Sequence, residues 1–166
     1  MRLSPVEVFA DSNVNDGLYL VILHAGRIPP HLGLLHQGLY YSSAAHKSYV
    51  AEPSAVLLKT IHLKSIPTLL VRLEVEISAN EMKEIFLCQG MLKTGETCLN
   101  PIRKVLKANE VNFVFELLDR LQKRESLKGF YGLNLATNAD NSFDLPHYTL
   151  QDVYLRIHEL RIKYAQ

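Results

Sequence analysis

The sequence contains no tryptophan, only two cysteines and almost no excess of charge of either sign. Cys88 and Cys98 are too few for the disulfide framework of a small secreted domain, and no histidine or cysteine pair has zinc-finger spacing. Lysine and arginine number 18 against 17 acidic residues, so the net charge of +1 gives no footprint for nucleic acid. No apolar run approaches the roughly 20 residues of a membrane-spanning helix. We therefore expect no metal, no nucleic-acid partner and no membrane span.

What the sequence does contain is the composition of a folded domain. Hydrophobic residues make up 48% of the 166 residues and charged residues 21%. We expect one domain over residues 1–166, with a core over about 15–125 and a C-terminal helical extension over about 126–166. The chain does not open with a basic segment followed by an apolar one, so we expect no secretory signal and a cytoplasmic location.

Strand patterns dominate the first half of the chain. The apolar run 18–23 follows a turn signal and predicts a buried strand. Segments 31–36 and 39–43 flank a glycine and predict a hairpin. Segment 68–77 alternates apolar and charged residues, which predicts a half-buried strand in a mostly antiparallel sheet. Segment 48–63 is ambiguous, although its proline is suited to the start of a helix.

Helical patterns dominate the second half. Ser78 and Glu81 fit a capping box that begins a helix, which we expect to end by Gly90. Apolar stripes predict helices over 109–123 and 149–164, and the stretch 127–146, which contains glycine and asparagine, is expected to form loops. Strands followed by helices indicate an α+β fold in which helices pack against an antiparallel sheet.

Cys98 is the residue with the clearest chemical potential. Pro101 is tolerated only in the first turn of a helix, so a helix begins beside Cys98, with Thr97 as its N-cap. A thiol at a helix start is expected to ionise more easily, and the thiolate is the reactive form. The alternative is that Cys98 packs as a small buried hydrophobe, which is also our expectation for Cys88.

A thiolate nucleophile needs a histidine within hydrogen-bond reach. His31 begins a predicted strand directly after a loop, and His36 ends the same strand. Because side chains alternate along a strand, a separation of five places these two histidines on opposite faces. At most one of them can therefore face the same cleft as Cys98.

Two short motifs resemble those of permuted papain-like folds, including the NlpC-type hydrolases and the lecithin:retinol acyltransferase-like proteins. In these families a histidine at the start of a strand precedes a cysteine at the start of a helix. Segments 31–35 and 37–42 resemble the histidine hairpin, and segment 97–101 resembles the cysteine segment. The resemblance covers roughly residues 18–108.

The resemblance implies a cysteine hydrolase or acyltransferase that uses no cofactor. Cys98 would attack the carbonyl of an amide or ester, with its own backbone N–H stabilising the oxyanion. His31 would accept the thiol proton and later protonate the leaving group. Ser42, Ser43 or His46 would orient the histidine, in place of the commoner carboxylate or amide. The substrate would be a peptide, a cell-wall fragment, an acyl lipid or a modified protein.

Two other classes of protein stay open. The missing carboxylate is compatible with a catalytically inactive binding or protein-interaction domain on the same fold. A small-ligand-binding α+β domain without a role for the thiol is the third reading. The sequence leaves the oligomeric state open, and segment 109–166 has the pattern either of a part of the core or of a lid over the cleft.

Overall fold

A seven-stranded sheet organises the protein in a computed structural model that describes residues 1–164. The strand order is β2-β8-β7-β3-β4-β5-β6, and every neighbouring pair is antiparallel except β2 with β8. The strands are β2 (Val6–Val8), β3 (Leu18–Leu23), β4 (His31–His36), β5 (Leu39–Ser43), β6 (Ser48–Pro53), β7 (Thr68–Leu73) and β8 (Leu127–Leu133). The expected α+β class with a mostly antiparallel sheet is confirmed.

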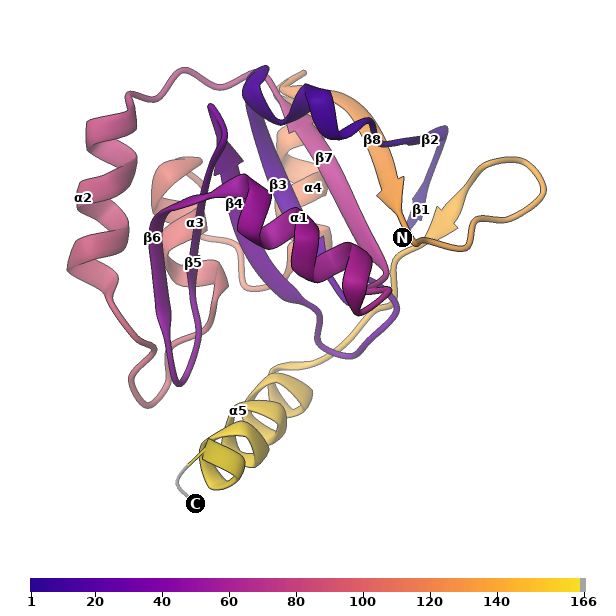
Figure 1. Cartoon of the computed structure of the whole chain (residues 1–166). Coiled ribbons are helices and arrows are strands. Elements are labelled where there is room, and N and C mark those ends of the chain that lie inside the picture. The colour runs from indigo at the N-terminus through magenta and orange to yellow at the C-terminus, as the bar shows by residue number, and fades with distance from the viewer. Residues whose placement is uncertain (165–166) are drawn as a thin grey trace.

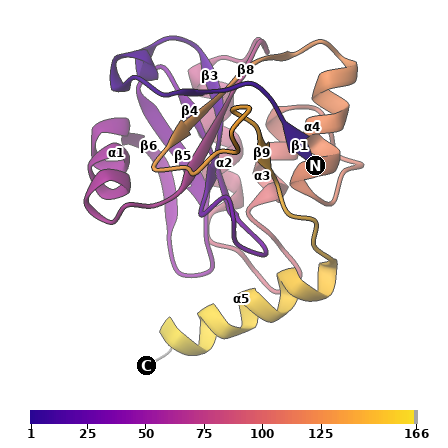
Figure 2. The same ribbon diagram turned by 90° about the vertical axis from the view of Figure 1, so that its right-hand side faces the viewer.

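Helices cover both faces of this sheet (Figures 1 and 2). They are α1 (Ser54–Leu63) on one face and α2 (Ala79–Gln89), α3 (Leu99–Val105) and α4 (Val114–Lys123) on the other. Alternation along β3 supplies both cores, because Leu20 and Ile22 pack with α2, α3 and α4, whereas Tyr19 and Val21 pack with α1.

The remaining elements lie at the edges of the molecule. A two-stranded ribbon pairs β1 (Arg2–Leu3) with β9 (Phe143–Asp144), and a 3-10 helix spans Asp11–Asn15. The helix α5 (Leu150–Tyr164) lies apart from the other helices, beyond one end of the sheet (Figures 1 and 2). Within residues 1–164, no helix has the length and apolar character needed to cross a membrane.

Local capping signals place two of these helices. The Ser78 side chain accepts the Glu81 N–H at 3.1 Å, and Gly90 ends α2 with a φ of 61°. Before α5, Asp152 Oδ2 accepts the Thr149 N–H at 2.7 Å, and Thr149 Oγ1 accepts the Asp152 N–H at 3.3 Å. Both predicted helix starts are therefore confirmed.

The expectation of loops over residues 127–146 is wrong for residues 127–133, which form β8 between β2 and β7. Two glycines hide this strand in the sequence, since glycine is normally a turn or loop signal. A Cβ at Gly129 would lie 3.0 Å from the hydroxyl oxygen of Tyr131, and one at Gly132 would lie 3.2 Å from Leu135 Cβ. Close packing therefore favours glycine here, and the core extends past residue 125.

Two boundaries differ from those predicted, and one ambiguous segment is resolved. The strand expected over 68–77 ends at Leu73. The helix expected from residue 109 begins only at Val114, because the Glu116 carboxylate accepts the Asn112 N–H at 2.7 Å and the Phe113 N–H at 3.2 Å. The ambiguous stretch 48–63 divides into β6 and then α1.

Candidate functional site

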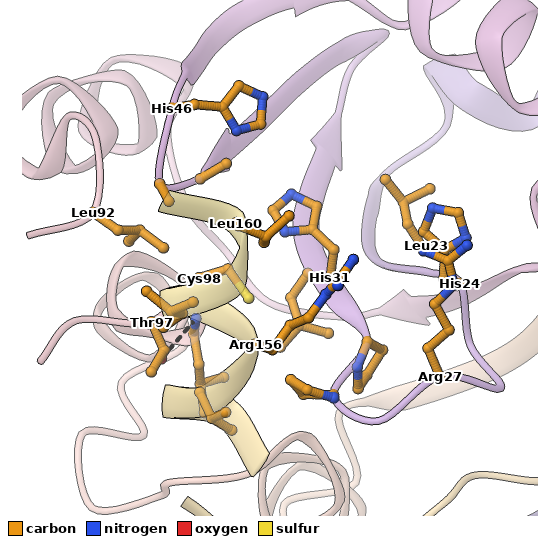
Figure 3. Close-up of a pocket in the computed structure, with 18 of the residues that line it drawn as sticks. Leu23, His24, Arg27, His31, His46, Leu92, Thr97, Cys98, Arg156 and Leu160 are labelled. Atoms are coloured by element: carbon orange, nitrogen blue, oxygen red, sulfur yellow. Dashed lines mark hydrogen bonds between the residues drawn. The ribbon is translucent and has the colours of Figure 1, made fainter. Parts of the chain in front are cut away.

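A pocket at the end of the sheet contains both Cys98 and His31 in its wall (Figure 3). Its volume is about 350 Å³, within the range of small-molecule sites. His31 is the first residue of β4, and Cys98 directly precedes α3. The sulfur of Cys98 is directed toward the strand that carries His31 (Figure 3). Two residues far apart in the sequence thus share one cavity.

The start of α3 fixes the position of Cys98. The hydroxyl of Thr97 accepts the Leu99 N–H at 3.3 Å, and Asn100 Oδ1 accepts the Thr97 N–H at 3.2 Å. Pro101 lies in the first turn, as predicted. The N-cap is Cys98 rather than Thr97, so the helix begins one residue later than expected. Cys98 is therefore held between a capped turn and a helix.

His31 is bound by a hydroxyl from the neighbouring strand β5. Ser42 Oγ lies 2.8 Å from His31 Nε2 and donates to the Leu32 carbonyl oxygen at 2.9 Å. A serine has one hydroxyl proton and a carbonyl oxygen can only accept, so this pattern assigns the proton on Nε2 to the bond with Ser42. In the neutral form of the ring, Nδ1 then carries the free lone pair.

The three residues expected as orienters of the histidine differ in their surroundings. Ser42 is buried and contacts His31. Ser43 is also buried, but its hydroxyl has no hydrogen-bond partner within the described residues. His46 lines the pocket and stacks on Tyr164, with ring centroids 3.9 Å apart. Of the three, Ser42 has the contact that orients an imidazole.

Burial sets the charge state of both reactive side chains. It raises the pKa of the Cys98 thiol to about 11, although the nearby N–H groups of Leu32, Cys98 and Leu99 favour the thiolate. It lowers the pKa of His31 to about 4, with a further decrease from the charges of His24 and His46. The N–H groups at the helix start favour the thiolate as expected, but desolvation outweighs them, so the expectation that Cys98 ionises easily is wrong for this structure.

The thiol and the imidazole are therefore both neutral near pH 7. Within residues 1–164, no hydrogen bond joins Cys98 to His31. The other cysteine, Cys88, is exposed on α2 rather than packed as expected, because it faces away from the sheet. It provides an exposed thiol for comparison with Cys98.

Helix α5 covers the pocket. Its residues Val153, Ile157 and Leu160 form part of the apolar wall. The Arg161 guanidinium donates to the Leu92 carbonyl oxygen at 3.2 Å and ties the end of α5 to the loop before α3. The C-terminal third therefore has both of the expected roles, because α4 and β8 complete the core while α5 lies over the pocket.

Sequence patterns did not identify four basic residues of the pocket. His24 and Arg27 come from the loop before β4, and Arg156 and Lys163 come from α5. No motif marks them, because a loop and a distant helix bring them together only in the folded chain. The apolar stripe of α5 was the one available signal, and it indicated packing rather than a binding partner.

The pocket combines a thiol, an imidazole with a defined hydrogen-bond partner and a wall that is mainly apolar. Such a set of groups is suited to nucleophilic attack on an acyl carbonyl. Comparison with protein-family models, with curated proteins and with solved structures finds no match for this chain.

Proposed function

We propose that this protein is a cysteine hydrolase or acyltransferase with a permuted papain-like order of elements, acting on an amide or ester. The observation that carries the proposal is the shared pocket of Cys98 and His31, in which Ser42 binds Nε2 of the imidazole at 2.8 Å. This bond leaves Nδ1 of His31 as the atom that can accept a proton.

The reaction needs only Cys98, His31, the substrate and water or another acyl acceptor. The thiol proton of Cys98 moves to His31 Nδ1 as the sulfur attacks the substrate carbonyl carbon. The tetrahedral intermediate collapses to a thioester, and the leaving amine or alcohol takes the proton from His31. Water or another acceptor then attacks the thioester, His31 accepts its proton, and the Cys98 sulfur is released. Protonation of the sulfur by His31 returns the site to its starting state.

The backbone N–H of Cys98 is the candidate donor to the oxyanion of the intermediate. It lies at the start of α3, beside the attacking sulfur. Substrate entry needs room beside the sulfur, which α5 partly occupies. We expect displacement of α5 to hydrate the site and to bring the pKa values of Cys98 and His31 closer to their ordinary values.

Acyl-enzyme formation tests the proposal. The full chain is incubated with p-nitrophenyl butyrate, and the acylated residue is located by mass spectrometry of peptides. We expect a butyryl group on Cys98, its loss in Cys98→Ala and its much slower formation in His31→Asn. Cys88→Ala is the matched control and should leave the adduct unchanged. Equal acylation of both thiols, or a rate indifferent to His31, would refute the proposal.

A catalytically inactive binding domain is the second candidate. The raised pKa of the Cys98 thiol favours it, because a buried neutral thiol is a poor nucleophile. On this alternative the pocket binds its ligand equally well in Cys98→Ala and in the unaltered chain, and no ester acylates Cys98. The two candidates therefore differ in whether a covalent intermediate forms, rather than in whether the pocket binds.

A further inference from the structure

The pocket around Cys98 has a one-sided distribution of charge. Its described lining contains no aspartate and no glutamate. Its basic side chains are Arg27, Arg156, Lys163, His24, His31 and His46. In a chain with nearly equal numbers of acidic and basic residues, such a lining is a local feature and not a consequence of overall charge.

The two arginines of the pocket come from different elements. Arg27 lies in the loop before β4 and Arg156 lies on α5, and Figure 3 shows Arg27 beside His24 and Arg156 near His31. After burial, the charges of Arg27 and Arg156 are the next causes that lower the pKa of His24. The charges of both guanidinium groups therefore act at His24, in the wall of the same pocket.

The two guanidinium groups are only weakly neutralised by acidic side chains. Arg156 Nη1 donates to Glu159 Oε2 at 2.9 Å, and both side chains are about half exposed. An exposed pair of this kind contributes little and can exchange for a ligand. Arg27 is exposed and forms no ion pair within the described part of the chain. Guanidinium donors are thus available at the mouth of the pocket.

Apolar side chains make up much of the rest of the lining. They include Leu23, Leu92, Leu99, Val153, Ile157 and Leu160. A cavity of about 350 Å³ accommodates a short hydrocarbon chain together with a small polar group. The pocket therefore offers hydrocarbon contacts and cationic donors within reach of one thiol.

We propose that the site takes an anionic acyl substrate, in which a carboxylate or phosphate lies near the reacting carbonyl and an apolar chain fills the cavity. Arg27 and Arg156 bind the anionic group through charge-assisted hydrogen bonds. The inference rests on the proposed function in calling the ligand a substrate, whereas binding of the anion depends only on the pocket. Arg156 lies on α5, so the anion also links this helix to the rest of the site.

NMR titration of the full chain with four small probes tests this inference. The probes are hexanoate, hexyl phosphate, the neutral isostere hexanamide and inorganic phosphate. We expect hexanoate and hexyl phosphate to shift the ring resonances of His24 and His31 at concentrations about tenfold lower than hexanamide. Inorganic phosphate should bind more weakly than hexyl phosphate, because it lacks the apolar chain.

Charge variants identify the groups responsible. The double variant Arg27→Gln/Arg156→Gln should bind hexanoate no better than hexanamide. Lys128→Gln removes the same type of charge from β8, outside the pocket, and should leave the preference unchanged. Glu159→Gln should strengthen hexanoate binding, because it frees the guanidinium of Arg156. In the unaltered chain, higher ionic strength should weaken hexanoate and not hexanamide.

The outcomes separate this inference from the proposed function. Equal binding of hexanoate and hexanamide, or a preference that survives the double variant, overturns the anion site even if Cys98 is acylated. Hexanoate preference in Cys98→Ser, together with no acylation of the unaltered chain, supports the anion site and rejects the thiol chemistry. If inorganic phosphate binds as tightly as hexyl phosphate, the inference that the cavity holds an apolar chain is overturned.

Discussion

Ser42 places its hydroxyl between the Nε2 atom of His31, at 2.8 Å, and the carbonyl oxygen that follows it in β4, at 2.9 Å. The hydroxyl thereby holds the ring and selects its tautomer. A serine replaces the more usual carboxylate, so Nε2 is bound by a neutral acceptor. The imidazolium that forms during catalysis receives no compensating negative charge from this partner.

The first prediction concerns that hydroxyl. Ser42→Ala should reduce the rate of acylation of Cys98 about tenfold, which corresponds to the loss of one hydrogen bond of about 1.4 kcal/mol. The measurement is the acylation rate by p-nitrophenyl butyrate, together with the ¹⁵N shifts of the His31 ring, which report its tautomer. Ser43→Ala removes the neighbouring buried hydroxyl, which has no described partner, and should leave both readouts unchanged. Equal effects of the two variants would contradict the positioning role.

The second prediction concerns stability at acidic pH. Burial lowers the pKa of His31 from 6.5 to about 4, so the unfolded chain binds more protons between these pH values. The free energy of unfolding should therefore rise with pH across this window, and up to about 3 kcal/mol should be lost as pH falls from 7 to 4. Denaturant titrations at several pH values measure the slope.

His31→Asn should reduce this slope without abolishing it, because burial also lowers the pKa values of His24 and His36. The same substitution at His158, which is exposed on α5, is the matched control and should leave the slope as it is. An unchanged slope in His31→Asn would mean that this imidazole is not desolvated in solution.

The fold was predictable wherever short-range chemistry decides the structure. The strand at 18–23, the hairpin at 31–43 and the capped starts of α2 and α5 all follow from local pattern. The strand β8 was not predicted, because Gly129 and Gly132 interrupt its apolar pattern and glycine is normally a turn or loop signal. The parallel pairing of β2 with β8 joins segments more than 100 residues apart, and no local signal encodes it.

For the candidate site, the sequence predicts where the reactive residues lie in their elements but not what surrounds them. The strand-start position of His31 and the helix-start position of Cys98 can be derived from the sequence. The direction of the pKa shift of the Cys98 thiol could not be derived, because it depends on how far the fold desolvates the sulfur. Arg27 and Arg156 were missed for the same physical reason, since only tertiary packing brings them together.

The third prediction concerns α5 as a cover over the thiol. Leu160→Ser weakens the contact of α5 with the pocket, and iodoacetamide should then alkylate Cys98 about tenfold faster, as expected for about 1.4 kcal/mol of lost packing. Leu155→Ser is the matched control, because Leu155 lies on the exposed side of the same helix. Alkylation of the exposed Cys88 calibrates the reagent in each sample. Equal rates at Cys98 in both variants would show that α5 does not limit access.

The fourth prediction concerns the packing of Tyr40 against Gly33, two residues after His31 in β4. A Cβ at Gly33 would lie 2.6 Å from the Tyr40 hydroxyl oxygen, and Tyr40 is only 3% exposed, so its ring must shift within the packed interior. Gly33→Ala should therefore lower the free energy of unfolding by about 1–3 kcal/mol in denaturant titrations. Gly26→Ala is the matched control and should have little effect, because nothing lies within 4 Å of its added methyl group.

A double-mutant cycle separates this contact from an effect on the backbone of β4. In a Tyr40→Leu background, the same Gly33→Ala substitution should cost clearly less, because the ring that meets the new methyl group is absent. An undiminished cost would assign the effect to the strand itself. Tyr40 and Ser42 lie two residues apart on β5, so their side chains are on the same face of the strand. Displacement of the ring by Gly33→Ala should therefore also change the ¹⁵N shifts of His31, through the hydroxyl of Ser42 that binds its ring.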